Sequence, residues 1–249
     1  MNKNEGLSFL RSSREKPREH LPVALVIDKS YSMGLIHGLL NRCIGQLLER
    51  MKQDPIFRNV VELLVIHYNH DVEEKADFLP LLQADAGGLD IQNCNGNTNT
   101  GKALLYALDR LEQRQQKWEA DVQHHYQPLC VLLTDGYPDA GLHAPEAYRR
   151  SVEADYAEAA CRIRQLEKDQ KLTFIAAGIQ QKDVRFRADM DRLRELTTHP
   201  NRAVPISEDL AELKHFDEFF ILVEKTTSAM FQSTPPEVID QEFWGIGAM

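Results

Sequence analysis

The sequence has few cysteines and no long apolar run. Its four cysteines include no C-x-x-C pair and lie far apart, so a zinc site is not expected. Cys43, Cys130 and Cys161 fall in apolar patterns typical of buried free thiols, whereas Cys94 lies in a loop and could be exposed. No stretch of about eighteen apolar residues is present, so we expect no membrane span.

Basic residues are outnumbered by acidic ones. The 249 residues include 29 Lys and Arg against 38 Asp and Glu, a formal net charge of −9. This balance argues against a broad nucleic-acid-binding face. Anionic membranes would also repel an acidic surface. The first twenty residues have no apolar core followed by a cleavage site, so the expected location is cytoplasmic.

Apolar runs alternate with helical patterns along most of the chain. Strands are predicted at 21–28, 60–69, 128–135 and 172–179, with a short one near 202–206. Helices are predicted over 35–51, after 97, over 148–166, near 185–197 and over 207–225. The alternating segment 71–81 indicates an antiparallel edge strand. This order predicts an α/β fold: a doubly wound, mainly parallel central sheet with helices on both faces.

The two ends of the chain depart from this pattern. Residues 1–20 are polar and charged and predict a flexible N-terminal arm, and residues 21–225 form the predicted domain. Residues 226–249 form a C-terminal tail with an extended connector, followed by Phe243 and Trp244. These apolar residues predict a tail that either packs on the domain or docks into a partner.

Polar residues gather where predicted strands end. Asp28, Ser30 and Ser32 alternate as the first strand runs into a loop, Asp135 ends the strand at 128–135, and Thr98 begins a helix. Sites in such sheets lie at the carboxyl ends of strands. Carboxylates and hydroxyls are hard oxygen ligands that suit Mg²⁺ or Mn²⁺ better than zinc. Each residue alone is also explained as a cap or a turn residue, but the set predicts a metal site.

This constellation resembles the von Willebrand factor A (VWA) domain with its metal-ion-dependent adhesion site (MIDAS). The family pattern is D-x-S-x-S, then T-x-x-G, then T-D-G. These motifs stand here at 28–32, 98–101 and 134–136. The resemblance covers about residues 20–225, with a Rossmann-like fold implied. It extends to the bacterial tellurium-resistance-associated (TerY-like) A domains, which carry similar T-D-G-x-P turns.

The resemblance implies a non-enzymatic protein–protein interaction module, in a bacterial stress-response or signalling complex. Ser30, Ser32 and Thr98 would give hydroxyl oxygens to the ion, while Asp28 and Asp135 would hold its waters. A protein partner would supply an acidic residue to the remaining coordination position. Family members often have a small residue between the two serines. Tyr31 stands there in this chain and would either contact a partner or obstruct the site.

Other functions were weighed on the same residues. Gly96 to Lys102 matches most of the phosphate-binding loop G-x-x-x-x-G-K-[ST], but Ala103 replaces the final hydroxyl residue, so no nucleotide is expected. A Mg²⁺-dependent phosphoryl-transfer or hydrolase enzyme is disfavoured because Ser30 stands where phosphatases with an Asp nucleophile carry a second Asp. No G-x-S-x-G elbow is present either. A VWA scaffold without metal is the third possibility.

Overall fold

The computed structural model describes residues 19–136 and 138–207, together with residues 219, 221, 223, 225 and 226. The strands are β1 (Glu19–Asp28), β2 (Val61–Tyr68), β3 (Val72–Pro80), β4 (His124–His125), β5 (Leu129–Thr134), β6 (Thr173–Gln180) and β7 (Ala203–Ser207). The helices are α1 (His37–Gln53), α2 (Phe57–Val60), α3 (Thr100–Ala120), α4 (Glu146–Lys168) and α5 (Met190–Glu195). Short 3-10 helices are η1 (Tyr31–Leu35), η2 (Leu81–Gln83), η3 (Gly87–Leu89), η4 (Val184–Phe186) and η5 (Pro200–Arg202). The predicted arm and tail lie outside the described residues, apart from Glu19, His20 and Thr226.

The strands form one mainly parallel sheet. Among the described residues it has seven strands in the order β3-β2-β1-β5-β6-β7, and the short β4 pairs with the start of β1. Every hydrogen-bonded pair of strands is parallel except β2 with β3. The predicted α/β fold with one antiparallel edge strand is therefore confirmed.

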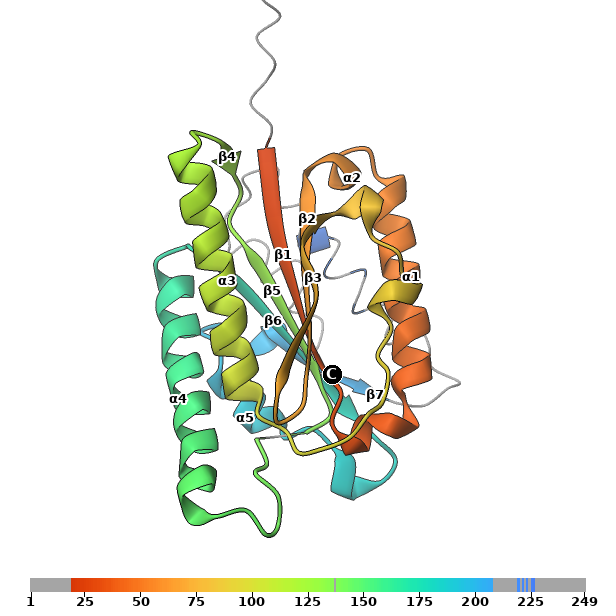
Figure 1. The fold of residues 1–249 in the computed structure, drawn as a ribbon, viewed down its shortest axis with the longest axis vertical. Helices are drawn as coiled ribbons and strands as arrows, with labels where there is room; N and C mark the ends of the chain where they lie inside the picture. Colours follow the sequence, from red (N-terminus) through yellow and green to blue (C-terminus); the bar gives the residue numbers. More distant parts are fainter. Residues whose placement is uncertain are drawn as a thin grey trace, which may run out of the picture.

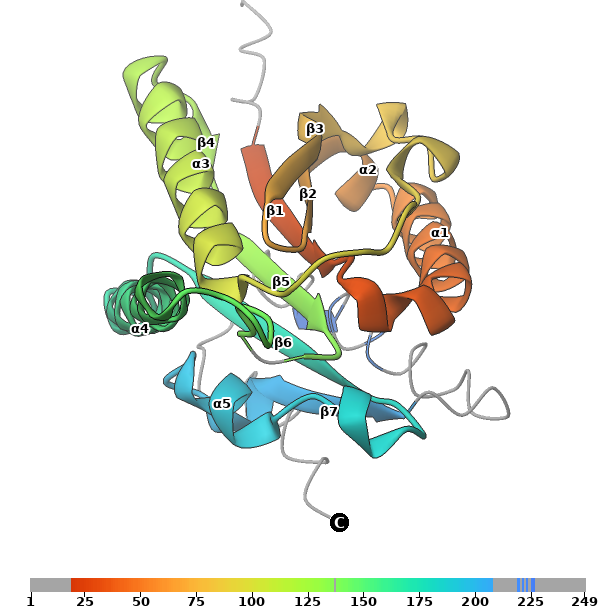
Figure 2. The same ribbon diagram turned by 60° about the horizontal axis from the view of Figure 1, so that its bottom comes forward.

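Helices cover both faces of the sheet (Figure 1). α3 and α4 lie side by side on one face and α1 lies on the other, as the turned view also shows (Figure 2). Successive side chains of β1 alternate between the two cores: Leu25 and Ile27 join the core under α1, whereas Ala24 and Val26 join the core under α3 and α4. Because the central strands are buried on both faces, they appear in the sequence as unbroken apolar runs.

The helix boundaries differ in part from the expectation. Leu35 belongs to η1 and is 75% exposed, so α1 begins only at His37. α5 covers six residues of the helix expected over 185–197. The described positions of the last predicted helix, from 219 to 226, are helical, and Phe219 and Val223 are buried in the α1-side core. No helix in the described part of the chain has the length and apolarity needed to cross a bilayer.

The expectation for Cys161 was wrong. Cys43 and Cys130 are buried as predicted, but Cys161 is exposed and Cys94 is half-buried. Cys161 lies two residues after Ala159, which faces the sheet, and two helical positions are about 200° apart at 3.6 residues per turn. Cys161 therefore points away from the core, although it stands in an apolar stretch of sequence.

Candidate metal centre

The loops after β1 and β5 meet at the carboxyl edge of the sheet. β1 and β5 are neighbours in parallel register, with Ile27 opposite Leu133. Asp28 is the last residue of β1, and Asp135 follows the last residue of β5. Both carboxylates are fully buried. The topology therefore brings together two acidic residues that are more than a hundred positions apart in the sequence.

Neighbouring donors hold the carboxylate of Asp28 on both of its oxygens. The backbone N–H of Ser30 donates to Oδ1 at 2.7 Å, and the hydroxyl of Thr134 donates to Oδ2 at 2.7 Å. Ser30 lies just before η1 with extended backbone (φ −61°, ψ 170°), which lets its N–H turn back towards Asp28. The loop after β1 and the end of β5 thus fix this side chain together.

A chain of hydrogen bonds joins the two serines to Asp135. The hydroxyls of Ser30 and Ser32 lie 3.2 Å apart, and the hydroxyl of Ser32 donates to Oδ1 of Asp135 at 2.8 Å. Four of the five predicted site residues are therefore linked by contacts between neighbouring side chains or backbone groups. Asp28, Ser30 and Ser32 lie together at the end of β1, which agrees with the alternation in the sequence.

Thr98 completes the set beside Gly136. Its backbone N–H donates to the carbonyl of Asp139 at 3.0 Å and its carbonyl accepts from the N–H of Asp139 at 2.8 Å. A Cβ built on Gly136 would lie 3.6 Å from the Thr98 hydroxyl oxygen and 4.0 Å from Oδ2 of Asp28. The helix cap is the neighbouring Asn99, whose side chain accepts from the N–H of Lys102 at 3.1 Å. The hydroxyl of Thr98 is therefore not used for capping.

The two buried carboxylates are electrostatically strained. Burial raises the pKa of Asp28. Burial, followed by the negative charge of Asp28, raises the pKa of Asp135 to about 7. No lysine or arginine in the described part of the chain forms an ion pair with either; the adjacent Lys29 turns away and pairs with Glu73 of β3. Among the described residues, this pair of carboxyl groups has no lysine or arginine to balance the charge that it carries when ionised.

Gln181 is a residue of this centre that the sequence analysis did not select. It follows β6 and is fully buried, and its amide nitrogen donates to Oδ2 of Asp135 and, at 3.1 Å, to the carbonyl of Ser32. Its amide oxygen is buried and has no hydrogen-bond partner among the described residues. Its position directly after a parallel strand, next to the strand that ends at Asp135, was the signal that could have identified it.

The segment that resembles a phosphate-binding loop has a structural explanation. Gly96 has φ +75°, and a Cβ there would lie 2.3 Å from the ring of His70. Gly101 lets α3 approach α4, because a Cβ there would lie 2.2 Å from the backbone nitrogen of Tyr156. The ammonium group of Lys102 donates to Asp71 at 3.1 Å. The two glycines thus serve the turn and the helix packing.

The donor set fits a divalent cation with oxygen ligands. It combines two carboxylates with the hydroxyls of Ser30, Ser32 and Thr98, which are hard oxygen ligands. The described residues contain no group of three His, Cys, Asp or Glu that could hold a metal ion, so a cation here would need the hydroxyl oxygens as ligands. The raised pKa of Asp135 and the unpaired oxygen of Gln181 both indicate a centre whose polar groups are incompletely satisfied by the protein alone.

The fold and this edge of the sheet define a known class of domain. The sequence model of the von Willebrand factor type A domain matches residues 23–219, so the chain belongs to this family. The earlier resemblance at the superfamily level is confirmed by this match. None of the curated proteins compared with the chain reaches significant similarity to it.

Solved structures share the fold at low sequence identity. The PilB minor pilin from Streptococcus sanguinis has a TM-score of 0.59 at 14% identity, over 89% of this chain and 64% of its own. The vWF domain of the type V pili tip protein Mfa5 from Porphyromonas gingivalis gives 0.54 at 14% identity, over 83% of this chain and 96% of its own. Proximal thread matrix protein 1 from the mussel byssus, solved with zinc in its MIDAS motif, gives 0.52 at 16% identity, over 84% of this chain. The match spans only 48% of that mussel protein.

Proposed function

We propose that this chain is a protein-binding module that holds a divalent cation at Asp28, Ser30, Ser32, Thr98 and Asp135. The observation that carries this proposal is the pair of fully buried carboxylates with no ion pair to a described lysine or arginine. A divalent cation would offset the burial and the repulsion from Asp28 that together raise the pKa of Asp135. The family membership supports the same conclusion.

Each residue of the centre has a separate task in this proposal. Ser30, Ser32 and Thr98 offer neutral hydroxyl oxygens, and Asp28 and Asp135 balance the charge from fixed positions, oriented by Thr134 and the other donors of the loop. When bound, the ion supplies an electrophilic point for a carboxylate of a partner protein. Neutral hydroxyl ligands leave that point only partly neutralised, so an acidic side chain is the partner group that fits.

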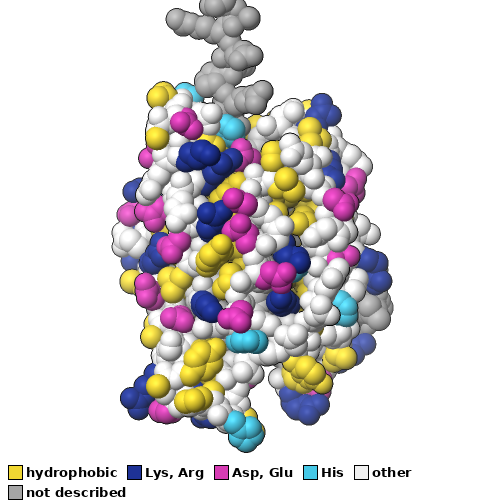
Figure 3. Space-filling model, viewed as in Figure 1, with side chains coloured by type: hydrophobic (Ala, Val, Ile, Leu, Met, Phe, Trp, Pro, Cys, Tyr) yellow, Lys and Arg dark blue, Asp and Glu magenta, His cyan; other side chains and the backbone are white. Residues whose placement is uncertain are grey.

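The surroundings of the centre fit a protein partner. Tyr31 and Leu35 of η1 and Leu142 of the loop before α4 are large apolar side chains that are 72%, 75% and 84% exposed. These segments are joined, because the N–H of Tyr31 donates to Gly96 and the amide of Asn97 donates to the loop that carries Leu142. Figure 3 shows a notch at the lower edge of the molecule, between two protrusions that bear apolar side chains. Of the two possible roles of Tyr31, contacting a partner and obstructing the site, its exposure favours the contact with a partner.

Binding is favoured over catalysis at this centre. Both oxygens of Asp28 are occupied by hydrogen bonds and the side chain is fully buried, which is unsuitable for a nucleophile that must reach a phosphate. Hard oxygen ligands favour Mg²⁺ or Mn²⁺. The zinc in the mussel protein makes Zn²⁺ the competitor that a test must include.

The wider setting is part of the same proposal. The T-D-G-x-P turn that begins at Thr134 supports a relation to TerY-like domains and hence a role in a bacterial stress-response or signalling complex. The four cysteines of the protein are free thiols, as is usual in a cytoplasmic protein. We place the domain at residues 21–225, between an N-terminal arm and a C-terminal tail.

Calorimetry tests the metal site directly. Mg²⁺, Mn²⁺ and Zn²⁺ are titrated into the wild type, Asp28→Ala, Thr98→Ala and the control Asp71→Ala, whose carboxylate is exposed and outside the centre. We expect binding to weaken by more than about a hundredfold in Asp28→Ala and by about tenfold in Thr98→Ala, with no change in the control. Equal binding by the wild type and Asp28→Ala would rule out the site.

The partner is tested with the same variants. The wild type loaded with the metal found by calorimetry is used to capture binding proteins, with Asp28→Ala as the matched control. We expect a protein that binds the wild type, is released by a chelator, and loses binding when one of its acidic residues is changed to the amide. Capture that is unaffected by chelator and by Asp28→Ala would show a metal-independent scaffold instead.

A further inference from the structure

Gln181 connects the two halves of the proposed centre. Its amide nitrogen contacts Asp135, from the loop after β5, and the carbonyl of Ser32, from η1 after β1. It comes from a third strand end, that of β6, and its own carbonyl accepts from the side chain of Arg187 at 2.8 Å. The buried side chain is held by two hydrogen bonds and the backbone by a third, so Gln181 is a fixed part of the centre.

The orientation of the Gln181 amide is determined by its neighbours. The opposite orientation would place the amide oxygen against the carboxylate of Asp135 and the carbonyl of Ser32, two groups that accept hydrogen bonds. The nitrogen must therefore face both groups, and the oxygen is left buried without a donor. A buried unpaired oxygen is costly unless a donor or a cation reaches it in the working state of the protein.

We propose that Gln181 is a sixth residue of the metal centre, and this inference rests on the proposed function. Its nitrogen holds Asp135 and the Ser32 loop in position. Its oxygen accepts a hydrogen bond from a water that arrives with the cation. Metal centres commonly depend on such outer groups as strongly as on the ligands themselves.

The neutrality of Gln181 also selects an acidic partner. A divalent ion between Asp28 and Asp135 has its charge balanced by these two carboxylates, and the partner's carboxylate would bring the total to −1. A glutamate at position 181, of nearly the same shape as Gln181, would already supply that third negative charge. The partner's acid would then bring the total to −2, which a buried site disfavours. The amide thus leaves the third carboxylate to the partner.

Two substitutions at this position separate the two roles. Gln181→Met keeps the size and removes both polar atoms, and Gln181→Glu keeps the shape and adds charge. The control is Gln180→Met, because the neighbouring Gln180 donates to Ala188 instead of to the centre. Mn²⁺ affinity is measured by calorimetry, and acetate, used as the external carboxylate, is titrated into the Mn²⁺-loaded proteins. Water-proton relaxation then reports the displacement of water from the ion.

The expected results differ for each variant. Gln181→Met should bind Mn²⁺ about 10- to 100-fold more weakly than the wild type and the control. Gln181→Glu should bind Mn²⁺ more tightly than the wild type and lose the response to acetate. Circular dichroism of each metal-free variant checks folding, and if Gln181→Glu fails to fold, Gln181→Met alone decides.

Two failures can be told apart. If the wild type and Gln181→Met bind Mn²⁺ equally while Asp28→Ala does not, the inference about Gln181 is wrong and the metal centre stands. If Gln181→Glu still responds to acetate as the wild type does, its role in selecting an acidic partner is wrong. If the wild type and Asp28→Ala bind Mn²⁺ equally, the proposed function is wrong, and so is the inference about Gln181 that rests on it.

Discussion

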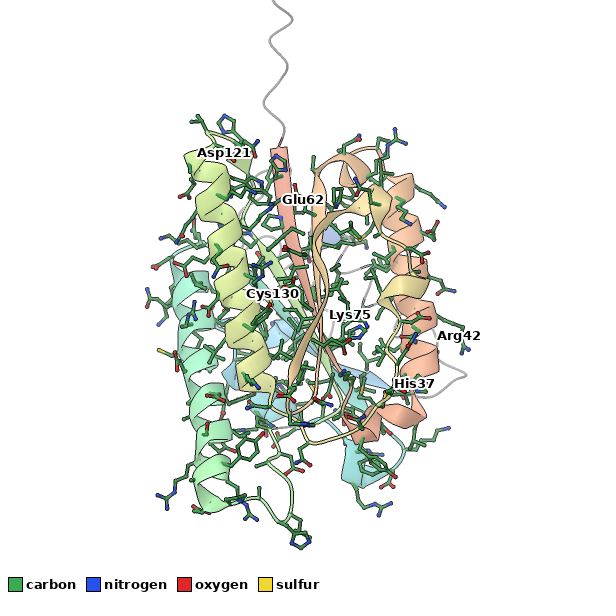
Figure 4. The ribbon with its side chains drawn as sticks, in the orientation of Figure 1. His37, Arg42, Glu62, Lys75, Asp121 and Cys130 are labelled. Atoms are coloured by element: carbon green, nitrogen blue, oxygen red, sulfur yellow. The ribbon has the colours of Figure 1, made fainter. Side chains whose placement is uncertain are left out.

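Buried acidic residues occur in two kinds of surroundings in this molecule. Glu62, at the start of β2, and Glu167, near the end of α4, are each nine-tenths buried or more, as are Asp28 and Asp135 at the opposite edge of the sheet. Figure 4 labels Glu62 near the upper end of the sheet, far from the carboxyl end of β1. The two glutamates have partners of opposite charge, whereas no described lysine or arginine forms an ion pair with either aspartate.

The pairing of Glu62 shows how this fold neutralises a structural acid. Arg114 of α3 donates to Glu62 through Nε at 3.1 Å and also through its terminal nitrogen, and Nδ1 of His20 lies 2.7 Å from the other oxygen. The guanidinium is itself fixed over the ring of Trp118, 4.9 Å from its centre. Each oxygen of Glu62 therefore has its own partner.

Glu167 follows the same rule by other means. Its carboxylate accepts hydrogen bonds from the hydroxyl of Thr197 at 2.9 Å and from the N–H of Thr198 at 2.6 Å, and the guanidinium of Arg202 lies 3.9 Å away. Among the described residues, the fold supplies an arginine to each buried glutamate and to neither buried aspartate. This contrast fits the proposal that an external ion balances Asp28 and Asp135 at that edge of the sheet.

The largest expected effect is the loss of the structural pair. Arg114→Ala leaves Glu62 buried without its main partner and removes the packing on Trp118, so we expect the free energy of unfolding to fall by about 3 kcal/mol. Urea unfolding measures this change. The control is Arg162→Ala, which breaks a more exposed pair with Asp109 and should change stability by less than about 1 kcal/mol. Equal losses of stability in the two variants would mean that buried Glu62 needs its arginine no more than exposed Asp109 does, and the contrast with the unpaired aspartates would not hold.

At the metal centre, we expect that removing a charged residue stabilises the metal-free folded protein instead of destabilising it. Asp135 has a pKa of about 7 in the folded protein and near 4 when unfolded, so between these values the folded state binds more protons than the unfolded state. In metal-free protein this contribution to stability is therefore present at low pH and is lost as the pH rises from about 4 to about 7. Asp135→Asn, which has no charge to lose, should be about 2 kcal/mol more stable than the wild type at pH 8.

The comparison with Asp135→Asn also removes a competing contribution. Burial lowers the pKa of His67 to about 4, so this residue stabilises the folded state more as the pH rises through that range. Both proteins contain His67, and the difference between their urea unfolding curves at pH 4, 6 and 8 isolates Asp135. A destabilised Asp135→Asn at pH 8 without metal would mean that the carboxylate has a cationic partner in the protein after all.

A smaller effect is expected on metal affinity. A cation must displace the proton of Asp135, so binding should tighten by up to about tenfold per pH unit from pH 5 to pH 7 and then level off. Calorimetry in two buffers with different ionisation enthalpies counts the proton released at pH 6. Affinity that is flat with pH, with no proton released, would show that Asp135 is already ionised before the metal binds.

The sequence was sufficient for every strand except β4 and for the proximity of Asp28, Ser30 and Ser32. Buried parallel strands have unbroken apolar runs, and the alternation after β1 aligned Asp28, Ser30 and Ser32 on one side. The structural pair of Glu62 and Arg114 could not be found in this way, because it joins residues 52 positions apart on a strand and a helix. A charged residue within an apolar run indicates a buried charge that needs a partner, but the run does not show which residue that partner is.

Other misses have local causes. Gln181 was passed over because an amide after a strand has no motif of its own, and only the sheet order places it beside Asp135. β4 has two residues, too few for any periodic pattern, and it forms only because His124 and His125 lie beside the start of β1. The expectation for Cys161 fails because an apolar stretch does not define a buried face: helical phase decides which side a residue occupies.

The smallest effect is expected for Lys102, the cation in the segment that resembles a phosphate-binding loop. Its ammonium group bonds to Asp71 and to the carbonyl of His70, on the exposed rim, instead of to Asp28 or Asp135. Lys102→Ala should therefore leave the urea midpoint and the Mn²⁺ affinity unchanged within error, and neither protein should bind ATP in calorimetry. If Lys102→Ala weakened Mn²⁺ binding or abolished ATP binding seen in the wild type, Lys102 would be serving the centre. Asp28 and Asp135 would then have a cation of the protein after all, as Glu62 and Glu167 do.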